Sequence, residues 1–355
     1  MNIALLGLPR AGKTTVFRAL TGLAMPDHGA SSAEKREKHL GVIHVEDERV
    51  DGLSAIFSPK KTTYSEITLI DMPAVDHGEK GPAIDPEQLG ALKTADAFLH
   101  VVRAFSNPSV AHPRGASDPM RDLQLVESEL VSTDYVVAAK RLERMEKEQL
   151  EGREREVLER CKAHLEGDQP LRLLELDEHE KEHIAGYSFA SQKPTLLVTN
   201  TDEKDMDGEA HGDLADYARS RGMGYLPICA EIEMEIGELE PEDAQVFLQE
   251  MGISEPAKPK YVRAVYETMD LLAFFTVATN EVKSWTVPAG TTAIQAAGHV
   301  HTDMARGFIR AEVVACADFL ETGGFSEARK EHKLQVEGKD YVVRDGDVIY
   351  FRFNV

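Results

Sequence analysis

Gly7-Leu8-Pro9-Arg10-Ala11-Gly12-Lys13-Thr14 has the form G-x-x-x-x-G-K-[ST]. It follows an apolar run at residues 2–7 that reads as a strand, and it precedes a helix-forming run at 13–22. In such a P-loop the glycines let backbone N–H groups turn inward around phosphates, and the amino terminus of the helix adds partial positive charge. We expect Lys13 to reach the β- and γ-phosphates and the Thr14 hydroxyl to bind Mg²⁺. The predicted phosphate site comprises Pro9, Arg10, Ala11, Gly12, Lys13, Thr14 and Thr15, with Arg10 either contacting phosphate or facing solvent.

Further apolar runs alternate with helical or turn-like sequence along the first part of the chain. The runs at 68–71, 97–102 and 195–200 read as short buried strands. Because strands that alternate with helices form parallel sheets, the sequence predicts an α/β fold with a doubly wound, mainly parallel sheet.

Two other regions differ in composition from this pattern. Residues 122–184 are rich in Glu, Arg, Lys and Leu, which predicts a helical hairpin inserted into the nucleotide-binding domain. From Leu272 onward β-type runs predict a small α+β domain. We therefore expect a nucleotide-binding domain at 1–125 and 188–270, a hairpin insert at 126–187 and a last domain at 272–355.

The composition restricts where the chain acts. Its 355 residues are 42% hydrophobic and 29% charged, as in a soluble protein of two or three domains. We see neither a membrane-spanning run nor the basic leader of a secretory signal. The formal charge of -22 disfavours indiscriminate binding to nucleic acid or anionic lipid. Cys161, Cys229 and Cys316 lie too far apart to indicate a disulfide framework or a zinc site. We expect a cytoplasmic monomer that contacts neither membrane nor DNA.

Three later segments are candidates for the rest of a nucleotide site. Asp71 ends an apolar strand, where a P-loop protein places the carboxylate that orients a magnesium-bound water; the alternative is a turn cap. Asn200-Thr201-Asp202-Glu203 stands where GTPases carry Asn-Lys-x-Asp to read guanine, but Thr201 and Glu203 alter that clamp. Specificity for GTP is therefore not expected. Behind the base we place Cys229-Ala230-Glu231, whose alternative is an ordinary loop.

At this point the chain resembles the Obg-like ATPase, or YchF, subfamily of P-loop GTPases, over nearly its whole length. The most specific matches are Gly7-Leu8-Pro9, residues 118–122, Asn200 to Glu203, and the runs at 274–276, 281–286, 309–313 and 351–355. The resemblance implies a carboxy-terminal TGS domain, which is a ubiquitin-like β-grasp module. It also implies slow Mg²⁺-dependent hydrolysis of ATP, often in preference to GTP, and association with ribosomes.

The resemblance also implies a catalytic residue and reveals two departures. His112 matches a family histidine in a flexible loop, and an imidazole can hold or accept a proton from water near pH 7; the alternative is a surface histidine. The family's apolar residue after the strand-end aspartate is Val75 here. Ala74 replaces a glycine that meets the γ-phosphate, and Lys35 replaces a magnesium-binding threonine, with only Ser31 and Ser32 nearby.

These departures leave two alternatives to a slow ATPase. One is a non-hydrolysing, nucleotide-sensing module, and the other is a GTP-specific switch, which Thr201 and Glu203 disfavour. From Ala273 onward, nine Lys and Arg face eleven Asp and Glu, so a local basic face for RNA is conceivable in the last domain. Its candidate residues are Lys283, Trp285, Arg306, Arg310 and Lys339, although Trp285 also reads as part of the β-grasp core.

Overall fold

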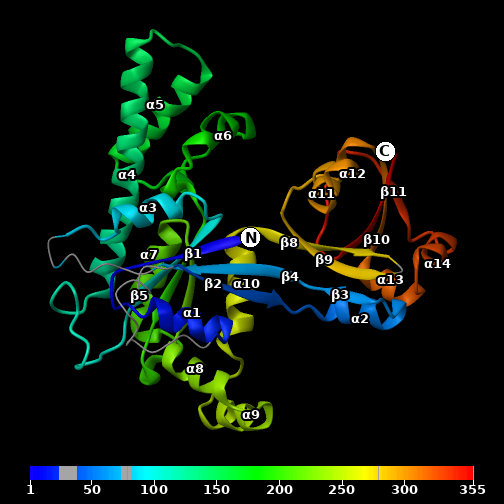
Figure 1. The fold of residues 1–355 in the computed structure, drawn as a ribbon, viewed down its shortest axis with the longest axis horizontal. Helices are drawn as coiled ribbons and strands as arrows, with labels where there is room; N and C mark the ends of the chain where they lie inside the picture. Colours follow the sequence, from blue (N-terminus) through cyan, green and yellow to red (C-terminus); the bar gives the residue numbers. More distant parts are fainter. Residues whose placement is uncertain (24–37, 73–77, 79–80, 279, 355) are drawn as a thin grey trace. The chain divides into compact units, whose positions relative to one another are not determined.

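The computed structural model describes residues 1–23, 38–72, 78, 81–278 and 280–354, which form two compact units (Figure 1). Unit 1 comprises residues 1–43 and 68–268, and unit 2 comprises residues 44–67 and 269–355. Two six-stranded sheets organise the chain.

The first sheet has the strand order β2-β4-β1-β5-β6-β7. The pairs β1–β4, β1–β5, β5–β6 and β6–β7 are parallel. The strands are β1 (Asn2–Leu6), β2 (His39–Val45), β4 (Ser65–Asp71), β5 (Ala97–Arg103), β6 (Thr195–Asn200) and β7 (Gly224–Ile228). Because β5 and β6 are buried along their whole length, they are apolar without alternation, as the sequence suggested. The predicted parallel sheet is confirmed.

Helices cover both faces of this sheet. The face that carries Ala4, Phe98 and Leu197 packs against α3 (Pro86–Leu92), α4 (Pro119–Lys147) and α7 (Gly212–Ser220). Helix α10 (Ala257–Thr268) lies on the other face. Thr268 of this helix and Leu196 of β6 both border Gly224, so they lie on the same side of the sheet. Because side chains alternate along a strand, that side is opposite to the one that carries Leu197. Helix α10 also contacts α1 (Lys13–Thr21), which packs against α8 (Ala230–Glu238). The sheet is therefore doubly wound.

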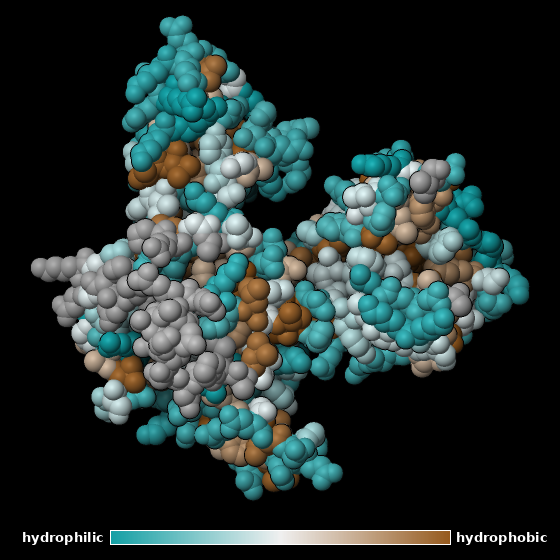
Figure 2. All heavy atoms as spheres, in the orientation of Figure 1, coloured by the Kyte–Doolittle hydropathy of each residue, from teal (hydrophilic) through white to brown (hydrophobic). Residues whose placement is uncertain are grey.

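The helical insert begins inside α4. The first turns of α4 pack on the sheet through Val126 and Leu130, whereas Met145 near its end packs against α5 (Arg153–Glu166). The predicted domain boundary at residue 126 therefore falls within one continuous helix. Figure 2 shows a mainly hydrophilic surface over the hairpin. Among the described residues, no helix is long and apolar enough to cross a membrane.

Shorter helices complete unit 1. These are α6 (Glu178–Ile184) and α9 (Pro241–Glu250), with 3-10 turns at Leu171–Leu173, Ala185–Tyr187, Ala190–Gln192, Glu203–Asp205 and Glu209–His211.

The second sheet has the order β11-β10-β12-β8-β9-β3. Its hairpin β8–β9 is antiparallel, and β12 lies beside β8 in parallel. The strands are β3 (Lys61–Thr63), β8 (Leu271–Val277), β9 (Glu281–Pro288), β10 (Phe308–Ala315), β11 (Gln335–Glu337) and β12 (Asp347–Phe353). Helix α11 (Ala293–Val300) packs on the face that carries Phe274 and Phe351. A hairpin crossed by one helix, with the last strand in the middle, is the predicted β-grasp arrangement.

Part of the segment 44–67, which sequence reasoning assigned to the nucleotide-binding domain, joins this sheet at its β3 edge and on its opposite face. Strand β3 pairs in parallel with β9, and Phe57 of α2 (Glu48–Phe57) stacks on Phe319 at 5.7 Å between ring centroids. The segment belongs to unit 2 because these contacts join it to distant parts of the sequence. The remaining helices of unit 2 are α12 (Thr302–Arg306), α13 (Cys316–Thr322) and α14 (Phe325–Lys330).

Candidate functional site

The P-loop connects β1 to α1 through two glycines that no other residue can replace without strain. Gly7 and Gly12 have φ angles of 131° and 90°, which side-chain-bearing residues rarely adopt. A Cβ atom on Gly7 would lie 2.2 Å from the Val101 carbonyl oxygen, and one on Gly12 would lie 2.2 Å from Asn200 Nδ2. The loop is thus pressed against β5 and β6, with the amino terminus of α1 behind it.

Lys13 is the buried cation of this loop. Its Nζ donates to the carbonyl oxygens of Gly7 (2.8 Å) and Leu8 (2.9 Å). Burial lowers the pKa of Lys13 to about 8, while the nearby Asp71 carboxylate acts in the opposite direction. The ammonium group therefore gives up hydration in the free chain, and a bound polyphosphate would stabilise its charged form.

Thr14 and Asp71 form a pair suited to Mg²⁺. The Thr14 hydroxyl donates to Asp71 Oδ2 at 2.8 Å, and Asp71 is 2% exposed. Within the described residues, Asp71 Oδ1 has no hydrogen-bond partner, and burial raises the pKa of this carboxyl. An orphaned carboxylate oxygen beside a hydroxyl is a hard-oxygen donor set of the kind that Mg²⁺ prefers. His39, which sequence reasoning missed, has its Nδ1 4.0 Å from Asp71 Oδ2.

Asn200 links the phosphate loop to the segment behind the base. Its Nδ2 donates to the Ala11 carbonyl at 3.2 Å, and its Oδ1 accepts from the Ala230 N–H at 3.2 Å. Both bonds are buried, and the backbone N–H of Thr201 donates to the Ile228 carbonyl. Asn200 therefore braces two loops that leave different strands of the sheet.

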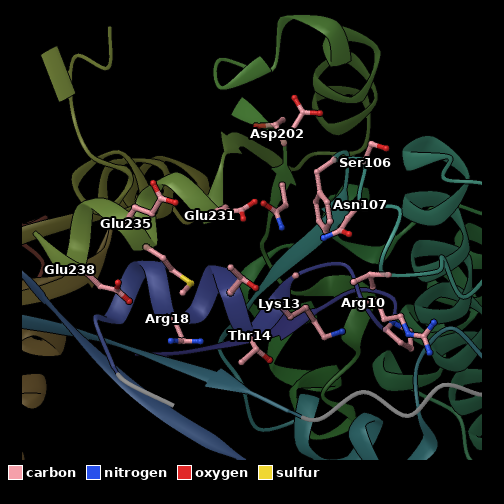
Figure 3. Close-up of a pocket in the computed structure, with 18 of the residues that line it drawn as sticks. Arg10, Lys13, Thr14, Arg18, Ser106, Asn107, Asp202, Glu231, Glu235 and Glu238 are labelled. Atoms are coloured by element: carbon pink, nitrogen blue, oxygen red, sulfur yellow. The ribbon is translucent and has the colours of Figure 1, made fainter. Parts of the chain in front are cut away.

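A cavity of about 760 Å³ opens in front of these groups (Figure 3). The described residues that line it are Pro9, Arg10, Gly12, Lys13, Thr14, Thr15, Arg18, Met72, Phe105, Ser106, Asn107, Val110, Asn200, Thr201, Asp202, Glu231, Met234, Glu235 and Glu238. It lies at the carboxyl ends of the parallel strands, where open α/β sheets bind ligands. Its size suits a nucleotide-sized ligand.

Most predicted binding residues lie at this cavity, with four exceptions. Ala11, Cys229 and Ala230 are buried behind it, and they contribute backbone or packing rather than lining. Glu203 begins a 3-10 turn and is not among the lining residues, whereas its neighbour Asp202 is. The 3-10 turn that begins at Glu203 explains why Asp202 lines the cavity and Glu203 does not, because the chain changes direction between the two residues.

Sequence reasoning missed two other walls of the cavity. One wall is the loop after β5, which contributes Phe105, Ser106 and Asn107. The sequence could have indicated this wall, because a loop that follows a central parallel strand lies at the edge where such sheets bind ligands. Met234, Glu235 and Glu238 form the second missed wall, and they share one face of α8 with Glu231, which the sequence did predict.

His112 lies apart from the cavity in this structure. Its Nε2 is 2.7 Å from Asp122 Oδ2, and its Nδ1 accepts the backbone N–H of Arg114 at 3.1 Å. Its side chain is 5% exposed. Both ring nitrogens are thus engaged at the start of α4, and contact with a nucleotide would require the loop that carries His112 to move. Ser31, Ser32, Lys35, Ala74 and Val75 lie outside the described residues.

Trp285 in the last domain packs against the β-grasp core. Its indole Nε1 donates to Thr276 Oγ1 at 2.9 Å, and the Lys283 ammonium lies 3.7 Å from the ring centroid. The structure therefore supports the interpretation that Trp285 belongs to the core of the last domain.

Comparisons with known proteins agree with this architecture. A family model described as 50S ribosome-binding GTPase matches residues 2–141, and the YchF-GTPase_C model, described as a protein of unknown function, matches residues 271–354. The ribosome-binding ATPase YchF of Haemophilus ducreyi is 36% identical over 360 residues, covering 99% of this chain and 98% of that protein. The protein of the same name from Bacillus subtilis is 35% identical over 369 residues, covering 100% of both chains.

Among solved structures, the YchF GTPase of Schizosaccharomyces pombe superimposes with a TM-score of 0.82 and 26% identity, covering 99% of this chain and 97% of that one. The identity to the bacterial proteins extends over both units and the hairpin, so it is not confined to the P-loop motif. The chain therefore belongs to the YchF family of P-loop nucleotide-binding proteins.

Proposed function

We propose that this chain is a slow, Mg²⁺-dependent nucleoside triphosphatase that prefers ATP to GTP, works in the cytoplasm as a monomer and associates with ribosomes. The observation that carries the enzymatic part is the hydrogen bond between Thr14, which lines the cavity beside Lys13, and the buried Asp71, whose second carboxylate oxygen has no partner among the described residues. The ribosomal part rests on relatives whose names include ribosome binding.

The residues divide the work between phosphate and metal. Lys13 leaves the Gly7 and Leu8 carbonyls and pairs with the β- and γ-phosphate oxygens, which are stronger acceptors. Thr14 and Asp71 would hold the metal. When bound, Mg²⁺ supplies charge neutralisation at the phosphate oxygens. Backbone N–H groups of the P-loop surround the same phosphates.

The base-binding end supports the preference for ATP. A guanine clamp needs an aspartate at the fourth motif position to accept two hydrogen bonds from the base, and here that position is Glu203, outside the cavity lining; the aspartate that lines the cavity, Asp202, stands one position earlier. His112 is the proposed group that holds or accepts a proton from water, after it leaves Asp122.

Titration with fluorescent ATP and GTP, followed by phosphate-release assays with and without ribosomes, tests the proposal. We expect tighter binding of ATP, slow release of phosphate that depends on Mg²⁺, and loss of binding in K13A. Tight GTP binding without ATP binding would refute the ATPase and favour a GTP switch. ATP binding without turnover under any condition would leave a nucleotide-sensing module. H112A should lose turnover and keep binding; an unchanged rate removes His112 from the mechanism.

The ribosomal contact is proposed to include RNA and the β-grasp sheet. Arg310, Arg329 and Arg352 all bond the buried Glu312 carboxylate, at 3.4, 2.9 and 3.2 Å, so the group keeps an excess of positive charge. Arg352 also stacks over the exposed Tyr350 at 4.5 Å. Cations beside an aromatic ring suit RNA phosphates and bases. Sequence reasoning included Arg310, with Arg306 and Lys339, but missed the other two arginines.

Co-sedimentation with ribosomes at increasing salt tests this surface. The R310A/R352A double variant should bind more weakly and with a smaller salt dependence, because phosphate contacts release counterions. K330A on α14 is the matched control, since Lys330 is exposed and pairs with Glu327 instead. Equal binding by both variants and the unmodified chain would exclude the surface.

A further inference from the structure

The loop between β5 and α4, residues 104–117, is held by two arginines that bond consecutive carbonyls. Arg103 Nη1 donates to the Val110 carbonyl at 3.0 Å and its Nη2 to that of Asn107 at 3.2 Å. Arg10 Nη1 donates to the Ala111 carbonyl at 2.8 Å. Arg103 belongs to the sheet, whereas Arg10 belongs to the P-loop. One of the two anchors therefore lies on the phosphate-binding loop itself.

Arg10 occupies a position that its backbone disfavours. Its φ angle is 64°, in the left-handed region where a residue other than glycine is uncommon. Strained residues of this kind concentrate at functional sites, where surrounding structure maintains them. Arg10 also lines the nucleotide cavity, where Figure 3 shows it beside Lys13. A phosphate in the cavity would thus be in reach of the same side chain that holds the loop.

The two acceptors open to Arg10 differ in strength. A hydrogen bond from a guanidinium to a phosphate oxygen is roughly twice as strong as one between neutral groups, and Arg presents a planar fork that suits phosphate. The Arg10 guanidinium also repels the Arg103 guanidinium. Burial is the main cause that lowers the pKa of Arg103, and the charge of Arg10 is the second. An anion near the P-loop would therefore draw Arg10 toward the cavity and away from the Ala111 carbonyl.

His112 directly follows the carbonyl that Arg10 holds. Its side chain is paired with Asp122, whose other oxygen accepts from Arg121 at 3.1 and 2.8 Å. If His112 leaves, the Asp122 carboxylate keeps Arg121, so the buried charge is not left unpaired. The loop can thus open at its His112 end at a modest cost.

We propose that Arg10 is a positioning residue that holds the 104–117 loop closed in the nucleotide-free chain and releases it when a nucleotide phosphate binds. This inference rests on the proposed function, because it assumes a triphosphate in the cavity. Its consequence is that movement of His112 depends on an occupied phosphate site, which ties hydrolysis to the bound state.

Hydrogen exchange measured by mass spectrometry on peptides that cover residues 108–116 tests the proposal. The amides to follow are those of Val110, Arg114 and Gly115, which donate to Asn107, His112 Nδ1 and the His112 carbonyl. In the unmodified chain a non-hydrolysable ATP analogue with Mg²⁺ should speed their exchange by about 10-fold or more, as expected for loss of a charged hydrogen bond.

Two variants at position 10 and one control decide the outcome. R10N tolerates the left-handed backbone but cannot reach Ala111, so its exchange should be fast without nucleotide and should not rise further. R10K keeps a cation and should restore slow exchange in the free chain. R219A removes an exposed arginine of α7 that pairs with Asp216 and does not line the cavity, and it should behave as the unmodified chain.

Slow exchange in free R10N, or equal acceleration by the analogue in R10N and the unmodified chain, would overturn the proposal. Binding of the analogue is measured on the same samples by fluorescence. If the unmodified chain binds no nucleotide, the proposed function fails. Fast exchange in free R10N would then still support the holding role of Arg10, and slow exchange would refute it.

Discussion

Replacing Asn200 with alanine removes both hydrogen bonds that join the P-loop to the segment behind the base. The variant leaves the Ala11 carbonyl and the Ala230 N–H without their present partners, and both groups are buried. It introduces no steric conflict, because alanine is smaller and Gly12 already packs against this side chain. Because Asn200 also lines the cavity, the effect on the brace itself is read at the Ala230 amide.

The expected magnitude follows from the two bonds. A typical intramolecular hydrogen bond contributes about 0.5–1.5 kcal/mol net, so the pair is worth about 1–3 kcal/mol. Without the brace, ATP binding must itself order the two loops. If the whole 1–3 kcal/mol opposes binding, the dissociation constant of ATP rises by up to about 150-fold. Because the two bonds join backbone groups of the P-loop and of the Ala230 segment, which would serve either nucleotide, ATP and GTP should lose affinity by the same factor.

Nucleotide titrations and hydrogen exchange at the Ala230 amide measure the two parts of this effect. T201V is the matched control: Thr201 is 3% exposed, its hydroxyl has no hydrogen-bond partner within the described residues, and valine has the same shape. The control should keep slow Ala230 exchange. Unchanged Ala230 exchange in N200A, or a loss of affinity that differs more than about fivefold between ATP and GTP, a gap of roughly 1 kcal/mol, would refute the reasoning.

Three other outcomes follow from the site and its support. The charged form of Lys13 binds phosphate, and the pKa of Lys13 in the free chain is about 8, so above pH 8 the side chain must take up a proton before ATP can bind. The ATP dissociation constant should therefore rise by up to about tenfold per pH unit in titrations from pH 7 to 9.5. The dissociation constant of K13R should not change with pH over this range. D71N should lose the difference in ATP affinity between Mg²⁺ and EDTA buffers, because it removes the carboxylate with the orphaned oxygen. Glu127 and Arg172 form a buried ion pair, so R172A should lower the free energy of unfolding by about 3–5 kcal/mol, measured in urea by circular dichroism. The double variant E127L/R172M should be neutral or stabilising, because it leaves no buried charge unpaired. Equal losses in both variants would contradict this.

Sequence reasoning succeeded where the chemistry is local. The spacing of Gly7, Gly12 and Lys13 is enough to predict a phosphate loop, because neighbouring residues build it from their own backbone. Alternation of apolar runs with helical sequence predicted the parallel sheet for the same reason. Asp71 was predicted from its place at the end of a parallel strand, the edge where such sheets bind ligands; in the structure it accepts a hydrogen bond from Thr14, and its role at a metal stays a prediction.

The misplacements involve tertiary contacts or turn geometry that residue patterns do not report. Residues 44–67 join the β-grasp sheet through pairing of β3 with β9, more than 200 residues away. Asp202 rather than Glu203 lines the cavity, because a 3-10 turn begins at Glu203. The pairing of His112 with Asp122 depends on how α4 packs on the sheet. No periodicity in the sequence reports any of these contacts.

By itself, the sequence predicted a phosphate loop, a parallel sheet and a small α+β domain at the end of the chain, since each rests on short-range patterns of glycine and apolar residues, whereas the β-grasp fold of that domain followed from the family resemblance. Only the tertiary structure decided what the site residues do to one another. Asn200 emerged as a brace, and Arg10 as the anchor of the His112 loop, because a hydrogen bond depends on positions that distant segments take up together.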